Sequence, residues 1–276
     1  MPTKKSPSLQ QALAQVEPLL RKMNDNLSPR PKASRKSLQG LLKKAKEPKT
    51  KEPAKPTGTP LSSRIEDFSE DRIKKLAALR EQALACTRCP NLVASRTQVV
   101  FGVGNPFAEL MFVGEAPGEK EDLLGEPFVG RAGQMLTKII NAMEYQREDI
   151  FIGNVLKCRP NMPPNTPGNR KPKLEEMTTC LPWLQQQIDL IKPRVLVALG
   201  ATALEGLLGK AIPMRDARGN WFDFQGIPTM VTYHPAYLLY SPSLTEKRKV
   251  WEDMLLVMEK LGRPISKKQR GYFLTK

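Results

Sequence analysis

The stretch LMFVGEAPGEKED, residues 110–122, joins a short apolar run to a tight turn and so indicates how the chain folds. Leu110 to Val113 have the character of a buried strand, and two glycines and a proline fall within the next five residues. A turn at the end of a strand is where α/β proteins approach a ligand. This turn lacks the glycine spacing of dinucleotide- and phosphate-binding loops, and it carries a carboxylate, Glu115. The stretch therefore predicts a site that uses a carboxylate.

Strands and helices alternate along the rest of the chain. Apolar runs at 150–156, 194–199 and 229–233 have the near-continuous hydrophobicity of strands buried on both faces. A first helix is expected near Phe68, with Ser69 as its N-cap. Later helices are expected near 131–143, 174–190, 201–208 and 245–261. This alternation predicts an α/β fold with three layers, α/β/α, around a mostly parallel four-stranded sheet.

Polar residues stand where these strands end. Glu115 follows the first strand, Asn154 lies near the end of the second, and His234, the only histidine, follows the fourth. The carboxyl ends of parallel strands meet at one edge of a sheet, where open α/β folds bind ligands. Asn is common in turns and a single His is more often a packed or surface residue, so each alone is weak evidence. The three together predict a polar site at that edge.

The chain has four cysteines, Cys86, Cys89, Cys158 and Cys180, of which the first two form a CxxC pair. No secretory apolar stretch follows the basic start, so we expect a cytoplasmic protein, in which four thiols favour a metal site over disulfides. Four thiolates suit zinc or a [4Fe–4S] cluster, and spacing does not separate the two. Either would pin the first helix and the Pro-rich loop to the sheet, in a structural role. Four unrelated buried cysteines are the alternative.

Positive charge is concentrated at the N-terminus. Residues 1–65 hold 15 Lys and Arg against 4 acids, a surplus of 11 out of the net +16. Residues 27–60 are rich in Lys, Pro and Ser and cannot bury a core. This charge favours a polyanion such as nucleic acid or an anionic membrane, and a solubilising tail is the alternative. No apolar run approaches the roughly 18 residues of a membrane span, so no membrane partner is expected.

Composition divides the chain into three parts. We expect a mostly disordered basic tail over 1–67, one folded domain over 68–262 and a basic C-terminal tail over 263–276. Within the first tail, apolar residues between Leu9 and Leu20 have helical spacing, which suits a docking peptide, although Pro18 weakens the helix.

Six segments taken together resemble a known family. In chain order they are CTRCPNL (86–92), VGEAPGEKED (113–122), GEPFVGRAGQML (125–136), NVLKCRP (154–160), PRVLVALGATA (193–203) and YHPAYLL (233–239). Residues 86–262 thereby resemble the family 4 uracil-DNA glycosylases, the iron–sulfur type of bacteria and archaea. The resemblance implies the uracil-glycosylase sandwich fold and hydrolysis of the N-glycosidic bond between uracil and deoxyribose, which leaves an abasic site. It also implies a structural [4Fe–4S] cluster on the four cysteines, with zinc less favoured, and no catalytic metal.

The resemblance also implies how a flipped uracil is held. The Asn154 amide has a donor for uracil O4 and an acceptor for N3–H, a pairing that rejects cytosine. The Phe128 ring would stack on the base, whereas an ordinary core Phe is the alternative. His234 would donate to uracil O2 and stabilise the charge that the departing base acquires.

Roles for the opening turn are likewise carried over from the family. Glu115 would orient the attacking water and stabilise positive charge on the sugar. Ala116 would crowd the C5 methyl of thymine. Glu119, Glu121 and Asp122 are expected to form a solvated loop edge.

Contacts with DNA are expected on either side of the site. Gly130 and Arg131 open a helix whose N-terminus suits a phosphate. Leu238 or Leu239 would wedge into the space left by the flipped base, and packing under the last helix is the alternative.

The expected substrate is uracil-containing DNA, single- and double-stranded, bound by a monomer. The basic tail is interpreted as a salt-sensitive DNA tether, with a replication or repair partner as a second possibility. A glycosylase-like module that binds DNA or such a partner without turnover is the alternative function, and loss of Glu115, Asn154 or His234 would have favoured it.

Overall fold

The described part of the chain begins with one long helix. The structure is a computed structural model that describes residues 61–163, 166 and 168–274. Most of the tail predicted over 1–67 lies outside these residues, and its last part, 61–67, is helical. Helix α3 (Leu61–Leu84) starts eight residues before the Ser69 N-cap that the sequence predicted. Neither Gly nor Pro interrupts these 24 residues, so nothing ends the helix before Leu84. Ser69 therefore lies inside the helix.

A sheet of six strands forms the middle layer, in the order β1-β3-β2-β4-β6-β5. The four central strands are the four predicted ones, and they are parallel. Two short antiparallel strands extend the sheet at its edges, so it has six strands where four were expected. The strands are β1 (Val103–Gly104), β2 (Leu110–Gly114), β3 (Phe151–Asn154), β4 (Val195–Leu199), β5 (Trp221–Phe224) and β6 (Ile227–Thr232).

The two edge strands were missed for different reasons. Strand β1 has only two residues, too few to show an alternating pattern. Strand β5 pairs with β6 through a hairpin whose turn residues, Gln225 and Gly226, have φ of 54° and 83°. Such a turn requires positive φ at both central positions, which Asn-Gly signals more clearly than Gln-Gly.

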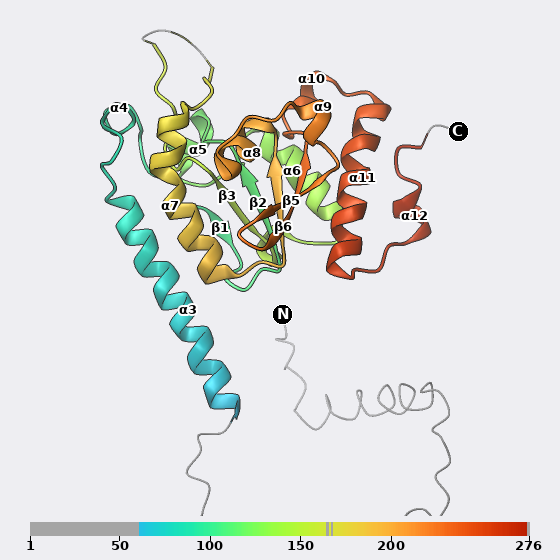
Figure 1. Ribbon diagram of the computed structural model, residues 1–276, viewed down its shortest axis with the longest axis horizontal. Helices are drawn as coiled ribbons and strands as arrows, with labels where there is room; N and C mark the ends of the chain where they lie inside the picture. Colours follow the sequence, from blue (N-terminus) through green and yellow to red (C-terminus); the bar gives the residue numbers. More distant parts are fainter. Residues whose placement is uncertain (1–60, 164–165, 167, 275–276) are drawn as a thin grey trace, which may run out of the picture. The chain divides into compact units, whose positions relative to one another are not determined.

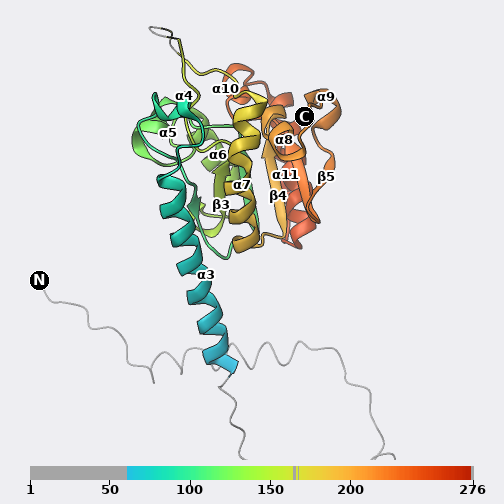
Figure 2. The ribbon, with the colours of Figure 1, turned by 60° about the vertical axis from the view of Figure 1, so that its left-hand side comes forward.

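Helices cover both faces of the sheet (Figures 1 and 2). Apolar side chains alternate between the faces along β2: Leu110 and Phe112 belong to the core with α6 and α11, while Met111 and Val113 belong to the core with α3, α7 and α8. This alternation confirms the predicted three-layer α/β/α arrangement. The remaining helices are α4 (Pro90–Val93), α5 (Glu119–Leu124), α6 (Arg131–Ala142), η1 (Arg147–Asp149), α7 (Leu174–Ile191), α8 (Ala201–Leu208), α9 (Met214–Ala217), α10 (Tyr237–Tyr240), α11 (Leu244–Leu261) and α12 (Lys267–Arg270).

Residues after α11 continue the folded part, whereas the sequence predicted a tail from residue 263. The Gln269 side chain is buried and its amide donates to the carbonyl of Ala142 at 3.0 Å. The Trp251 indole donates to the Gln269 carbonyl at 2.6 Å, and its ring lies 5.2 Å from that of Tyr272. These contacts dock α12 on α11 and α6.

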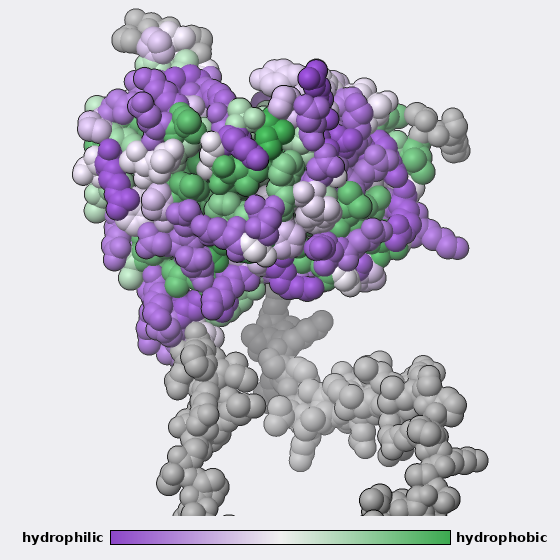
Figure 3. Space-filling model, viewed as in Figure 1, coloured by the Kyte–Doolittle hydropathy of each residue, from purple (hydrophilic) through white to green (hydrophobic). Residues whose placement is uncertain are grey.

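Hydrophilic residues make up much of the surface in the space-filling view (Figure 3). Hydrophobic residues gather near the centre of that face, over α8 and the β5–β6 hairpin. Within residues 61–274, as far as they are described, no helix combines the length and apolarity needed to span a bilayer.

Candidate functional site

The carboxyl ends of β2, β3, β4 and β6 bring the predicted polar residues to one edge of the sheet. Gly114 at the end of β2 pairs with Asn154 at the end of β3. Leu199 at the end of β4 pairs with Thr232, two residues before His234. Parallel register therefore places Glu115, Asn154 and His234 at the same edge of the sheet, with β4 between the strands that carry Glu115 and His234.

Gly114 lies at the centre of this edge. A Cβ atom at Gly114 would collide with Asn154 Oδ1 and lie 2.6 Å from the Phe128 ring. The Phe128 ring is in turn 5.6 Å from the His234 ring, centroid to centroid. The structure thus brings an amide, an aromatic ring and an imidazole around one glycine, and we call these four residues the edge site.

The Asn154 side chain has an unused acceptor. The residue is 2% exposed, and its Oδ1 has no hydrogen-bond partner among the residues that the structure describes. An unsatisfied buried acceptor of this kind costs about 1–3 kcal/mol. The edge site is therefore ready to receive a donor from a ligand.

His234 is held as a neutral imidazole. Desolvation lowers its pKa to about 4, against a smaller opposite effect of the Glu121 carboxylate. The backbone N–H of Ala236 donates to Nδ1 at 3.2 Å, so the ring proton is on Nε2. Gly200 leaves room for this arrangement, since a Cβ there would lie 3.2 Å from the His234 Cβ. The ring can donate one hydrogen bond from Nε2 without carrying a charge.

Glu115 lies partly buried beside the edge site. Burial raises the pKa of its carboxyl group. A hydrogen bond from the Thr202 hydroxyl and the charge of Lys171 lower that pKa, and Glu205 raises it again. Ala116, the next residue, is half-buried and packs against the core that α7 and α8 share.

The prediction of a solvated edge for the acids of α5 is wrong for two of the three. The Glu121 carboxylate accepts from the N–H groups of Val129 and Gly130 at 3.0 and 2.8 Å. Asp122 is 3% exposed and accepts from the Thr97 N–H at 3.1 and 2.9 Å. Both carboxylates replace water as acceptors for loop amides, and Glu121 thereby braces the loop that carries Phe128. Only Glu119 is exposed as expected.

The predicted phosphate contact lies at the start of α6. Gly130 is the residue before the helix, and Arg131 is exposed. The Gly130 N–H is already bonded to Glu121. Any anion at this end must therefore rely on the later amides of the first turn and on the Arg131 guanidinium.

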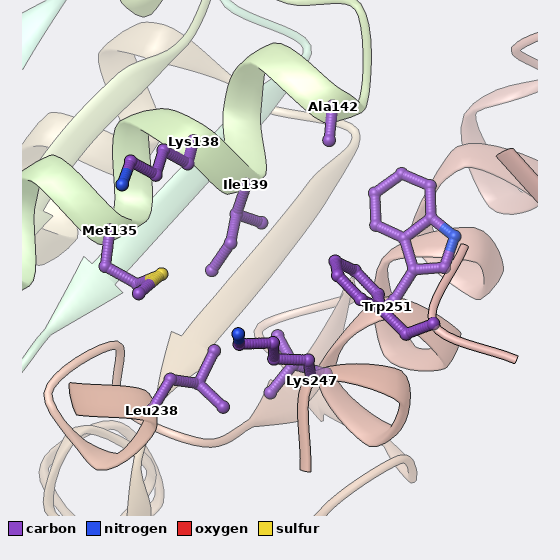
Figure 4. A pocket seen from close by; sticks show the side chains of 9 residues that line it. Met135, Lys138, Ile139, Ala142, Leu238, Lys247 and Trp251 are labelled. Carbon is purple, nitrogen blue, oxygen red and sulfur yellow. The ribbon is translucent and has the colours of Figure 1, made fainter. Parts of the chain in front are cut away.

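The two predicted wedge leucines differ in burial. Leu238 is 3% exposed and lines an apolar cavity of about 240 Å³ together with Ile139 and Trp251 (Figure 4). Leu238 thus adopts the packed position that was the alternative to a wedge. Leu239 is half-buried, and Tyr240 beside it is 86% exposed.

The four cysteines come from three separate segments, since Cys86 and Cys89 share the link between α3 and α4. Cys86 follows α3, Cys89 precedes α4, Cys158 follows β3 and Cys180 lies in α7. Burial raises the pKa of Cys89, and the nearby charges of Cys158 and Cys86 raise it further. The pKa of Cys180 is likewise raised by the charges of Cys158 and Cys89. The fold thus gathers all four into one region, which we call the thiol region.

Protein donors already face the thiol region. Arg96 Nη1 donates to Cys158 Sγ at 3.1 Å, and the Lys157 backbone N–H donates to Cys180 Sγ at 3.2 Å. Burial raises the pKa of Cys180 to about 12. In the described part of the chain, no group of three or more His, Cys, Asp or Glu lies close enough together to hold a single metal ion. The set is thiol-rich but wider than a single-ion site.

Sequence reasoning missed three groups near these sites: Thr202, Lys171 and Arg96. Thr202 follows the end of β4, so the strand-end rule that selected Glu115 would have found it. Lys171 and Arg96 lie in loops, and only the tertiary contacts reveal them.

Comparison with known proteins gives consistent matches. The family model described as the uracil DNA glycosylase superfamily matches residues 101–255. The chain is 44% identical over 185 residues to the type-4 uracil-DNA glycosylase of Thermotoga maritima, covering 66% of this chain and 93% of that protein. It is 39% identical to that of Sulfurisphaera tokodaii, covering 72% and 90%, and 36% identical to that of Archaeoglobus fulgidus, covering 73% and 98%.

Proposed function

The chain belongs to the type-4 uracil-DNA glycosylases of the uracil-DNA glycosylase superfamily, and we propose that it excises uracil from DNA with the edge site and Glu115. The reaction is hydrolysis of the bond between uracil N1 and the sugar, and it leaves an abasic site. A base must leave the DNA duplex to reach a buried amide such as that of Asn154, so the chain acts on a flipped nucleotide.

The unused acceptor of Asn154 carries the proposal. Uracil presents an N3–H donor next to the O4 acceptor, which complements Oδ1 and the amide N–H of one asparagine. Uracil would thus supply the hydrogen bond that Asn154 Oδ1 lacks among the described residues. Cytosine presents an acceptor at N3 and is rejected, because two acceptors would then face each other without a proton.

Phe128 and Gly114 fit the flat shape of the base. The absence of a side chain at Gly114 leaves open the space between Asn154 Oδ1 and the Phe128 ring. A planar pyrimidine occupying that space would stack on the ring, an interaction worth about 1–3 kcal/mol per base. Ala116 follows Glu115 in the same turn and would crowd a methyl group at C5, which disfavours thymine.

His234 stabilises the leaving group. As the bond to the sugar breaks, negative charge develops on uracil O2, and the Nε2–H of a neutral imidazole donates to it. The Ala236 N–H holds the required tautomer. The low pKa of about 4 keeps the ring neutral through the physiological range, so it acts as a donor and not as an acid.

Glu115 serves the sugar side of the reaction. A carboxylate next to Gly114 can orient the attacking water and stabilise the positive charge that develops on the sugar. Both tasks require the ionised form, whereas burial favours the neutral one. The Thr202 hydroxyl and Lys171 counteract that effect.

Cys86, Cys89, Cys158 and Cys180 would hold a [4Fe–4S] cluster. The donor set suits this group, since each thiolate of such a cluster binds a different iron and the four need not converge on one ion, as zinc would require. The N–H donors from Arg96 and Lys157 suit thiolate charge. The cluster would supply a structural cross-link between α3, α7 and the segment after β3.

DNA contacts and cellular setting complete the proposal. Arg131 and the first turn of α6 would contact a phosphate, and Leu239 is the candidate wedge because Leu238 is packed. The basic N-terminal segment would tether the enzyme to DNA in a salt-sensitive way, or dock a repair partner. We expect a cytoplasmic monomer that acts on single- and double-stranded DNA.

An excision assay tests the proposal directly. Purified protein should release uracil, and not thymine, from oligonucleotides without added magnesium, and hypoxanthine should be included as a third substrate. Asn154→Asp should abolish uracil release or relax selectivity toward cytosine, because the amide donor is lost. Asn141→Asp makes the same change at an exposed position of α6 and should leave release unchanged. Unaltered uracil release by Asn154→Asp would refute the recognition of the base by this residue.

A further inference from the structure

The N-terminus of α8 meets the Glu115 carboxylate at the edge of the sheet. Strands β2 and β4 are parallel neighbours, with Val113 opposite Ala198. Continuing the register puts Glu115 opposite Gly200, directly before the first residue of α8. Thr202, the second residue of this eight-residue helix, therefore comes next to Glu115.

Two independent features of this junction favour an ionised Glu115. The Thr202 hydroxyl donates a hydrogen bond to the carboxylate. The amino end of α8 carries partial positive charge, which stabilises an anion within its first turn. We propose that Thr202 is a positioning residue, which holds the Glu115 carboxylate in one orientation toward the reacting sugar.

The charged groups that face Glu115 come from two other places. Lys171, in the loop before α7, pairs with Glu205 on α8 at 2.5 Å, three residues after Thr202. Lys171 lowers the pKa of Glu115 and Glu205 raises it. His234 packs against Gly200. Its pKa of about 4 makes the ring neutral at any pH well above that value. Glu115 is thus flanked by one cation, one anion and one neutral donor from Thr202.

A fixed orientation matters because a freely rotating carboxylate spends little time with an oxygen directed at the attacking water. Water attack needs one oxygen to accept from the water while the other is held. A hydrogen bond from the Thr202 hydroxyl to one oxygen would leave the other oxygen for the water. This inference rests on the proposed function, since it assigns a task to Thr202 through Glu115.

The test is the pH dependence of single-turnover uracil release. Thr202→Val keeps the shape of the side chain and removes the hydroxyl, so the acid limb of kcat should move to higher pH. At the acid end kcat should fall about tenfold, the order expected for loss of one hydrogen bond to a charged group. Thr202→Ser restores the hydroxyl and should return the limb to its original place.

Matched controls separate this effect from a change in packing. Thr178→Val makes the same change on α7, where the hydroxyl bonds the Leu174 carbonyl, and should leave the profile in place. Glu205→Gln removes the opposing charge and should move the acid limb to lower pH. A loss of stability would lower activity in both variants. It would not move the acid limb to higher pH in Thr202→Val and to lower pH in Glu205→Gln.

Glu115→Gln separates the positioning role of Thr202 from the proposed function. This variant should abolish most activity; if it does not, the role of Glu115 itself fails. If Glu115→Gln is inactive while Thr202→Val keeps the wild-type profile, only the positioning role of Thr202 is overturned. Should Thr202→Val not fold, Thr202→Ala replaces it, and the same shift of the acid limb is expected.

Discussion

The edge site and the thiol region are both partly buried and polar, yet they treat their polar atoms in opposite ways. In the edge site, Asn154 Oδ1 has no partner among the described residues. In the thiol region, Cys158 and Cys180 accept from Arg96 and from the Lys157 backbone. An unpaired buried acceptor lowers stability, whereas paired groups need not. A site that binds and releases a ligand keeps such an atom free, and a structural site uses its donors permanently.

This difference separates activity from stability. Changes in the edge site should alter turnover and leave folding nearly intact, because the polar atoms there contribute little to the folded state. Changes in the thiol region should do the reverse. Each of the following experiments can break or sharpen that contrast.

Cys158→Ala should have the largest effect, and it should be on stability. Losing one ligand of the proposed cluster should cost several kcal/mol, so Tm should fall by roughly 10 °C or more. Iron content and broad visible absorbance should fall with it, while uracil release well below the transition is affected less. A variant with full iron content, or one that loses turnover at unchanged Tm, would contradict the structural role.

His234→Leu should have the largest effect on turnover. Loss of a donor to developing charge costs about 3 kcal/mol in the barrier, which corresponds to a fall in kcat of roughly 10²–10³-fold. Single-turnover excision measures this fall, and thermal unfolding at pH 7 checks that the fold is intact. A fall well short of tenfold would remove His234 from leaving-group stabilisation.

The same variant should change the pH dependence of stability. The pKa of His234 is about 4 in the folded state and 6.5 in its reference state, so the unfolded chain binds the extra proton between these values. The neutral His234 in the folded state therefore lowers the free energy of unfolding as pH falls from 6.5 to 4, by up to about 3 kcal/mol. Asp253, with a pKa raised by burial to about 6, acts in the opposite direction over part of that window.

The difference between wild type and His234→Leu removes the contribution of Asp253, since both proteins share it. Urea unfolding at neutral pH and at a pH just above the folded-state pKa of His234 should show that the variant loses less stability on acidification than the wild type. Parallel losses in the two proteins would mean that the imidazole is not held neutral by the fold.

Gly114→Ala should have a smaller but specific effect. Its Cβ would enter the space between Asn154 and Phe128, and overfilling a packed site costs about 1–3 kcal/mol. We expect kcat/KM for uracil release to fall about 10- to 100-fold, as that cost implies. Gly153→Ala is the matched control on the adjacent strand, because a Cβ there meets its nearest atom, Lys157 Nζ, at 3.5 Å and fits. An equal fall in kcat/KM in both variants would show that the space at Gly114 is not required for binding the base.

Much of the fold followed from local patterns. The four apolar runs became β2, β3, β4 and β6, and helix α8 has the predicted bounds of 201 and 208. These elements have strong periodicity and clear ends. Strand β1 has two residues, and α12 begins at Lys267 in a basic segment without apolar spacing, so both depend on contacts with distant parts of the chain.

The candidate site followed less completely. Glu115, Asn154 and His234 were predicted together because parallel strands end at one edge. Glu121 was misjudged, because a charged residue just after a glycine-containing turn normally faces water. Only the approach of the Val129 and Gly130 amides shows that its carboxylate is an internal acceptor.

The sequence by itself determined the order of strands and helices and the kinds of chemical group at the strand ends, because hydrophobic periodicity is a property of neighbouring residues. Tertiary structure alone decided how those groups are used: the free acceptor of Asn154, the tautomer of His234, the packed position of Leu238 and the hydroxyl beside Glu115. Hydrogen-bond partners and desolvation depend on atoms brought together from distant parts of the chain, and no local pattern encodes them.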